Sequence, residues 1–151
     1  MAANQAPIYT LTPKRASNTW LPATTANVKS DGTGTVGTDI LLIATAGTNG
    51  SFLNKIILTP TASAAATGTT GTVGRVYLST VTSGATTNAN THLVAEVAAP
   101  AQTADQTAAA TSPIIIPLGF AIAASDTVLF SMHAAAAAST SWHIILLYGD
   151  Y

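Results

Sequence analysis

The chain has 151 residues, and its five Lys or Arg and six Asp or Glu give a formal net charge of −1. Charged residues amount to 7%, against about 25% in an average soluble domain, which excludes the basic surface that nucleic-acid binding needs. The length suits one domain, the absence of cysteine excludes disulfides and thiolate metal sites, and so little charge predicts an exterior that faces other proteins.

The first residues carry neither the basic start nor the apolar stretch of a signal peptide. The longest apolar runs, such as residues 144–148, are far shorter than the roughly 20 residues that a membrane span needs. The sequence therefore predicts a protein that is made in the cytoplasm and is not inserted in a membrane.

Residues 1–22 contain three prolines, which favour an extended backbone and cannot donate to a ladder of strands. The segment also holds the only adjacent basic pair of the chain. We predict an extended N-terminal arm that stays out of the domain's own sheet, is disordered in the free protein and becomes ordered on a partner. The residues expected to contact that partner are Ile8, Tyr9, Leu11, Lys14, Arg15 and Trp20. Two alternatives stay open: a loose tail without a partner, and a Trp20 that belongs to the domain's own core.

Residues 39–60 hold two apolar runs on either side of Asn49-Gly50, the strongest short hairpin pattern in the chain. We predict a central hairpin at this point. The first run, residues 40–43, is continuous, which is typical of a strand covered on both sides by its own fold or by another chain. In the second run both alternate faces are largely apolar, and Pro60 ends the ladder because it has no N–H.

Further strands are predicted at residues 26–30, 73–80, 92–97, 113–117, 127–134 and 139–151. Residues 73–80 and 92–97 form a second hairpin, and the prolines around residues 113–117 are typical of an edge strand. About eight short strands with turns between them predict an all-β fold, a β-sandwich, and a jelly roll is the arrangement we favour. Residues 23–151 then form a single domain that follows the arm at residues 1–22.

Residue types with catalytic or metal-binding chemistry are few and scattered. The three histidines lack metal-ligand spacing on any strand face, so no metal and no cofactor is expected. Ser141, His143 and Asp150 are the residue types of a hydrolytic triad, but they lie on one predicted strand, where nine residues span about 30 Å. The glycine pattern at residues 32–37 precedes a strand instead of opening a helix, which favours turns over phosphate binding. We therefore expect no enzymatic activity.

Several short motifs carry a resemblance to a known family: residues 31–35, residues 46–51 leading into Lys55-Ile56, residues 75–78, Glu96 and residues 148–151. Over residues 27–151 the chain resembles small β-rich virion proteins of tailed bacteriophages, whose members are similar to capsid decoration, or cement, proteins. The resemblance implies a virion structural protein that binds the major capsid protein on the capsid exterior and stabilises the shell. The chain departs from the family in its longer Ala/Thr loops.

The three-fold positions of an icosahedral shell favour a homotrimer of such a protein. Two other functions stay open: a tail or receptor-binding module of the virion, and glycan binding or hydrolysis. Exposed aromatic side chains serve glycan binding in β-sandwiches, and the candidates here are Tyr9, Trp20, Tyr77 and Trp142. Neither a nucleic acid nor a membrane is expected as a partner.

Overall fold

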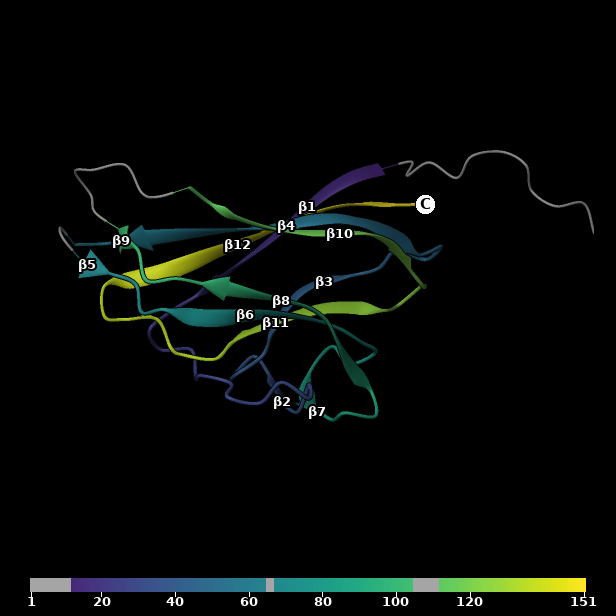
Figure 1. The fold of residues 1–151 in the computed structure, drawn as a ribbon. Helices are drawn as coiled ribbons and strands as arrows, with labels where there is room; N and C mark the ends of the chain where they lie inside the picture. Colours follow the sequence, from purple (N-terminus) through teal and green to yellow (C-terminus); the bar gives the residue numbers. More distant parts are fainter. Residues whose placement is uncertain (1–11, 65–66, 105–111) are drawn as a thin grey trace, which may run out of the picture.

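The computed structural model describes residues 12–64, 67–104 and 112–151, which form twelve β-strands and no helix. No helix that could span a membrane occurs among them. Two four-stranded antiparallel sheets lie one above the other (Figure 1). Sheet 1 has the order β1 (Thr12–Trp20), β12 (Thr140–Asp150), β4 (Ser51–Ala62), β10 (Ile114–Ile122). Sheet 2 has the order β3 (Leu41–Thr45), β11 (Thr127–Met132), β6 (Thr72–Ser79), β8 (Thr91–Ala99).

Two small sheets complete the fold. One joins β2 (Gly34–Val36) to β7 (Gly84–Thr86), and the other joins β5 (Thr67–Gly68) to β9 (Thr103–Ala104). The predicted all-β, sandwich-like architecture is confirmed. The described residues form twelve strands instead of about eight, because the Gly- and Thr-rich loops contribute four short strands; the other eight make the two large sheets.

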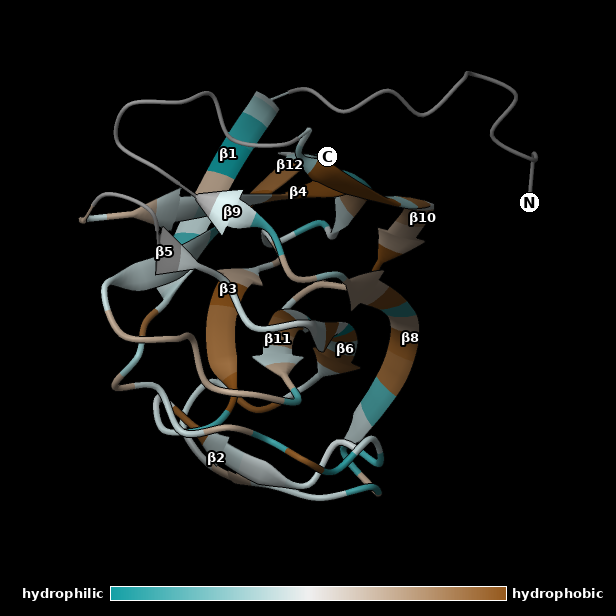
Figure 2. Ribbon diagram, turned by 60° about the vertical axis from the view of Figure 1, so that its left-hand side comes forward, coloured by the Kyte–Doolittle hydropathy of each residue, from teal (hydrophilic) through white to brown (hydrophobic). Residues whose placement is uncertain are grey.

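The core lies between sheet 1 and sheet 2. Alternation along each strand turns every second side chain inward, and Figure 2 shows strongly apolar stretches on strands of both sheets. The inward residues are Leu53, Ile56, Leu58, Trp142, Ile144 and Leu146 from sheet 1, and Val76, Val128, Phe130 and Met132 from sheet 2. These side chains are almost completely buried, so both sheets are held together by apolar packing.

The predicted central hairpin is wrong, because the strands on either side of Asn49-Gly50 belong to different sheets. β3 pairs with β11 in sheet 2, whereas β4 pairs with β12 and β10 in sheet 1. The turn itself is tight: Gly50 has a φ of 89° and its N–H donates to the carbonyl of Gly47 at 3.0 Å. A connection that crosses from one sheet to the other lets both apolar strands cover the core from opposite sides, which a local hairpin cannot do.

The expectation that residues 1–22 stay out of the domain's own sheet is wrong for residues 12–20. These residues form β1, which pairs with β12 from Thr12 opposite Asp150 to Trp20 opposite Trp142. Pro13 is tolerated because β1 lies at the edge of sheet 1, where one side of the strand has no neighbour to receive its N–H groups. Residues 1–11 lie outside the described part of the chain.

The second predicted hairpin is confirmed, since β6 and β8 are antiparallel neighbours in sheet 2. The predicted edge strand is confirmed as β10, which extends further than residues 113–117 and bends where its register with β4 shifts, between Pro117 and Phe120. The short strand predicted at residues 26–30 does not form.

Candidate docking face

The outer face of sheet 1 is the candidate interface. The register of β1, β12, β4 and β10 places outward side chains side by side in rows that cross the sheet. We name three of them: the cation row (Arg15, Leu147, Lys55, Pro117), the isoleucine row (Ser17, Ile145, Ile57, Ile115) and the hydroxyl row (Thr19, His143, Thr59). Together they are called the docking face. Neighbouring rows are two residues apart along each strand, which is about 7 Å.

The docking face is unusually apolar for an uncovered sheet surface. Antiparallel sheets with one solvated face normally alternate between apolar and polar residues, yet Ile57, Ile115 and Ile145 all point outward here. Ile115 is 52% exposed, and no described strand lies above sheet 1 in Figure 1. Ile57 and Ile145 beside it are half-buried, so the row presents an apolar strip of the kind that marks interaction sites in proteins.

A shallow hollow lies along the docking face between β1 and β12. It has a volume of about 280 Å³ and is lined by Arg15, Ser17, Asn18, Thr19, His143 and Ile145. Hydroxyl, imidazole and guanidinium groups therefore border the isoleucine row on the β1 side. An interface with an apolar centre and a polar rim has this composition.

The outer face of sheet 2 is covered by the chain itself along β3, β11 and β6. Ile40, Tyr77 and Leu129 form a small buried cluster there, with Val36 and Leu42 packed against it. β11 is therefore shielded on both faces, which explains why every one of its residues is buried. The apolar outward residues of β3 and β11 are thus satisfied within the fold, whereas those of sheet 1 are not.

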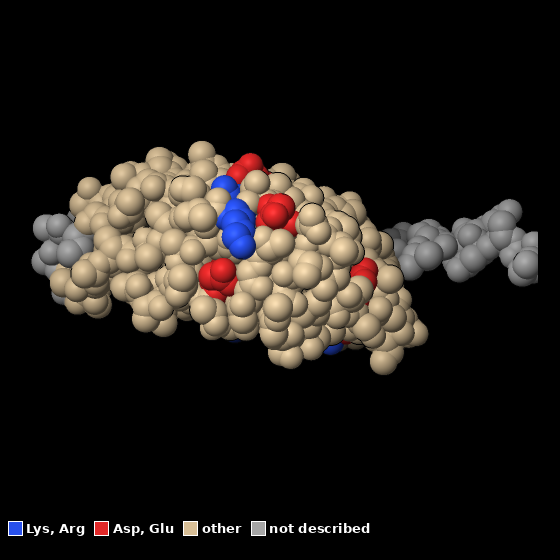
Figure 3. All heavy atoms as spheres, turned by 90° about the horizontal axis from the view of Figure 1, so that it is seen from below, with Lys and Arg blue, Asp and Glu red and all other residues tan. Residues whose placement is uncertain are grey.

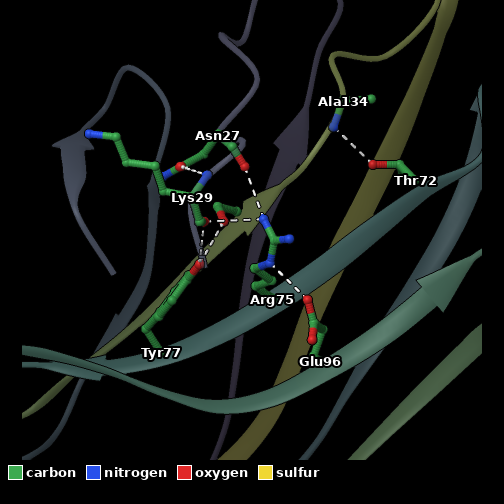
Figure 4. Close-up of polar contacts among 8 residues, drawn as sticks. Asn27, Lys29, Thr72, Arg75, Tyr77, Glu96 and Ala134 are labelled. Carbon is green, nitrogen blue, oxygen red and sulfur yellow. Dashed lines mark hydrogen bonds and ion pairs between the residues drawn. The ribbon is translucent and has the colours of Figure 1, made fainter. Parts of the chain in front are cut away.

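Arg75 fastens residues 27–29 to sheet 2 (Figure 4). Its Nη1 donates to the carbonyl oxygens of Asn27 at 3.0 Å and Lys29 at 3.1 Å, and its Nε donates to Glu96 at 2.9 Å. The hydroxyl of Tyr77 donates to the same Lys29 carbonyl at 3.4 Å. Residues 27–29 form a loop instead of the predicted strand, and side chains of sheet 2 satisfy the carbonyls of Asn27 and Lys29.

The two outer surfaces also differ in charge. On the sheet 2 side, acidic and basic side chains lie close together on a surface that is otherwise uncharged (Figure 3). The cation row on the opposite side contains Arg15 and Lys55, and no carboxylate belongs to the three rows of the docking face. The docking face is therefore apolar at its centre and positive along one row.

Lys14 is not part of the docking face, because it pairs with Asp150 at the end of β1. Asp150 also accepts a hydrogen bond from the hydroxyl of Ser51 at 2.6 Å. The Lys14 ammonium and then the Ser51 hydroxyl hold the pKa of the Asp150 carboxyl below its ordinary value of 3.8. The carboxylate thus ties the edge strand β1 to both β12 and β4.

Because the pKa of Asp150 is lower in the folded state, its contribution to stability is present above pH 3.8 and is lost as the pH falls through the folded pKa. We expect amide protons of β1 to exchange faster, relative to those of β4, as the pH drops through that window. Hydrogen exchange corrected for intrinsic rates measures this difference. Asp150→Asn should remove the pH dependence and Asp126→Asn, a matched change in a turn, should retain it; an unchanged β1 profile in Asp150→Asn would contradict the role of this carboxylate.

The residues predicted to contact a partner are separated by the structure. Arg15 lies on the docking face, and Lys14 makes the pair with Asp150. Trp20 is completely buried in the domain's own core, where its Nε1 donates to the carbonyl of Ala134 at 3.1 Å, so it is not available to a partner. Ile8, Tyr9 and Leu11 lie outside the described residues.

Sequence reasoning missed the greater part of the docking face, including Lys55, Ile57, Ile115 and Ile145. The pattern that could have found it was present: both alternate faces of β4 and β12 are rich in apolar residues. One face then suits the domain core and the other needs a second cover. Which strands stand side by side could be learned only from the register.

No catalytic arrangement emerges from the described residues. The hydroxyl of Ser141 forms a hydrogen bond of 2.7 Å with the hydroxyl of Thr61 near one end of β12. Asp150 contacts Lys14 and Ser51 at the other end. No group of three or more His, Asp or Glu that could hold a metal occurs within residues 12–64, 67–104 and 112–151. Comparisons of the chain with models of protein families, with curated proteins and with solved structures find no match.

Proposed function

We propose that the chain is a structural protein of a tailed-bacteriophage virion, which binds the major capsid protein on the outside of the shell and stabilises it. The observation that carries this proposal is the docking face: an uncovered sheet surface with a row of three outward isoleucines. Burying such a surface against a shell contributes roughly 25 cal/mol for each Å² of apolar area. The few charges of the chain support the same conclusion, since a charge-poor exterior favours association.

We further propose that the sandwich is a jelly roll. Numbering the eight strands of the two large sheets in chain order gives the orders 1-8-3-6 and 2-7-4-5. The first strand thus lies beside the last, the second beside the seventh, the third beside the sixth and the fourth beside the fifth. Two Greek keys folded over each other have this nesting, and the fold occurs in viral capsid proteins as well as in lectins and cupins.

The proposed role is non-enzymatic and is performed on the capsid exterior after synthesis in the host cytoplasm. The proposal that the role is non-enzymatic is supported by the positions of Ser141, His143 and Asp150, which are spread along β12 and do not meet at one point where a substrate could bind. We propose a homotrimer as the assembly, because the three-fold and quasi-three-fold positions of a shell offer three equivalent docking places.

Quantification of the protein in purified virions tests the proposal. We expect many copies in each particle, and a virus lacking the protein should have shells that break at lower temperature. A count of a few copies for each particle, or recovery only from the lysate, would contradict the decoration role. An adsorption defect with unchanged shell stability would instead assign the protein to the tail or to receptor binding.

A further inference from the structure

We infer that the docking face recognises a protein surface on which two carboxylates, roughly 10 Å apart, lie beside an apolar patch. This inference rests on the proposed function and gives the chemistry of the shell surface that the protein binds. Arg15 and Lys55 stand in one row on β1 and β4, with Leu147 of β12 between them. Two strand spacings of about 4.8 Å separate their backbones, so carboxylates about that far apart can meet both side chains at once.

The two cations of the docking face have no counter-charge among the described residues. Of the five basic residues of the chain, Lys14 pairs with Asp150 and Arg75 pairs with Glu96. Lys29 is the remaining one, and its side chain extends away from the Arg75 cluster in Figure 4. Two of the three cations that form no ion pair with a described residue therefore lie in one row of one sheet face.

Every described side-chain carboxylate is already engaged within its own chain. Glu96 and Asp150 are the partners of Arg75 and Lys14. The other three accept hydrogen bonds inside their own turns: Asp31 from Thr33, Asp39 from the Thr35 N–H, and Asp126 from the Ala123 N–H. A second copy packed face to face would bring the Arg15 and Lys55 of its own three rows and no carboxylate from them, so we assign the counter-charges to a different protein.

The isoleucine row requires an apolar patch on the partner surface, beside the carboxylates that the cation row requires. It lies about 7 Å from the cation row, so both rows contact the same partner surface. Apolar burial at the centre supplies affinity, while the rim charges steer the encounter and fix the register of the two surfaces. The geometry thus points to one partner surface with an aliphatic or aromatic centre and carboxylates along one side.

Binding of purified protein to shells that lack it tests this inference, and the double variant Arg15→Glu with Lys55→Glu is the central measurement. We expect its affinity to fall at least roughly tenfold at low salt, because two attractive contacts become repulsive. Wild-type affinity should fall as salt rises, and that of Arg15→Gln with Lys55→Gln should change less. Ile115→Asn should weaken binding at every salt concentration.

Matched controls lie on the sheet 2 side. Lys29→Glu reverses the third unpaired cation, and Leu93→Asn replaces a side chain that is 40% exposed, comparable to Ile115. Both are expected to bind as the wild type does, and thermal unfolding verifies that all variants fold.

If both double variants bind shells as tightly as the wild type, the carboxylate inference is overturned and the proposed function stands. A wild type that does not bind shells at any salt concentration would overturn both. Sedimentation that shows a dimer broken by Ile115→Asn would assign the docking face to a second copy and would also overturn the inference.

Discussion

Replacing Trp20 with alanine is expected to lower the free energy of unfolding by about 3–5 kcal/mol, the usual cost of deleting a buried aromatic side chain. Trp20 is completely buried at the end of β1, opposite Trp142 of β12. Its Nε1 also donates to the carbonyl of Ala134, which would lose that partner. Urea unfolding followed by circular dichroism measures the change, and hydrogen exchange should show β1 opening more often.

Leu21→Ala is the matched control for Trp20→Ala. Leu21 is the next residue in the chain and is 48% exposed, so its truncation should change the stability by no more than about 0.5 kcal/mol. The opposite pattern, a Trp20→Ala variant as stable as the wild type but unable to bind a partner, would contradict the core position. It would restore Trp20 as a docking residue of an N-terminal arm.

Replacing Arg75 with methionine is expected to destabilise the fold by about 1–3 kcal/mol, the cost of a buried acceptor that loses its donor. The carbonyl oxygen of Asn27, a residue only 2% exposed, accepts from the Arg75 guanidinium, whereas the Lys29 carbonyl keeps the Tyr77 hydroxyl as a second donor. Methionine retains the apolar stem, so the variant isolates the hydrogen bonds from the packing. Urea unfolding gives the magnitude.

Glu96→Gln separates the ion pair from the carbonyl contacts of Arg75. The Glu96 side chain is 46% exposed, so its pair with Arg75 contributes less than about 1 kcal/mol. Hydrogen exchange should show faster exchange of the Asn27 and Lys29 amides in Arg75→Met and little change in Glu96→Gln. Equal effects of both substitutions would mean that the ion pair, and not the carbonyl contacts, fastens residues 27–29 to sheet 2.

Much of the local structure of this protein could be predicted from its sequence. The period of two along β12 correctly assigned Trp142, Ile144 and Leu146 to one face and His143 to the other, because strand geometry alone decides that alternation. The β6–β8 hairpin followed from two alternating runs that are close in the chain. The edge position of β10 followed from Pro113 and Pro117, because a residue without an N–H suits a strand that has a neighbour on one side only.

The tertiary structure decided what depends on partners far away in the chain. β1 joins β12 although it is 120 or more residues away in sequence, and Asn54 is skipped in the pairing of β4 with both β12 and β10. That bulge brings Leu53 and Ile56 to the same inner face, where strict alternation would place them on opposite faces. The docking face arises in the same way, since Arg15, Lys55 and Ile115 come from three distant strands. Local propensity carries no information on strand order, because it is the burial of whole sheet faces that selects which strands stand side by side.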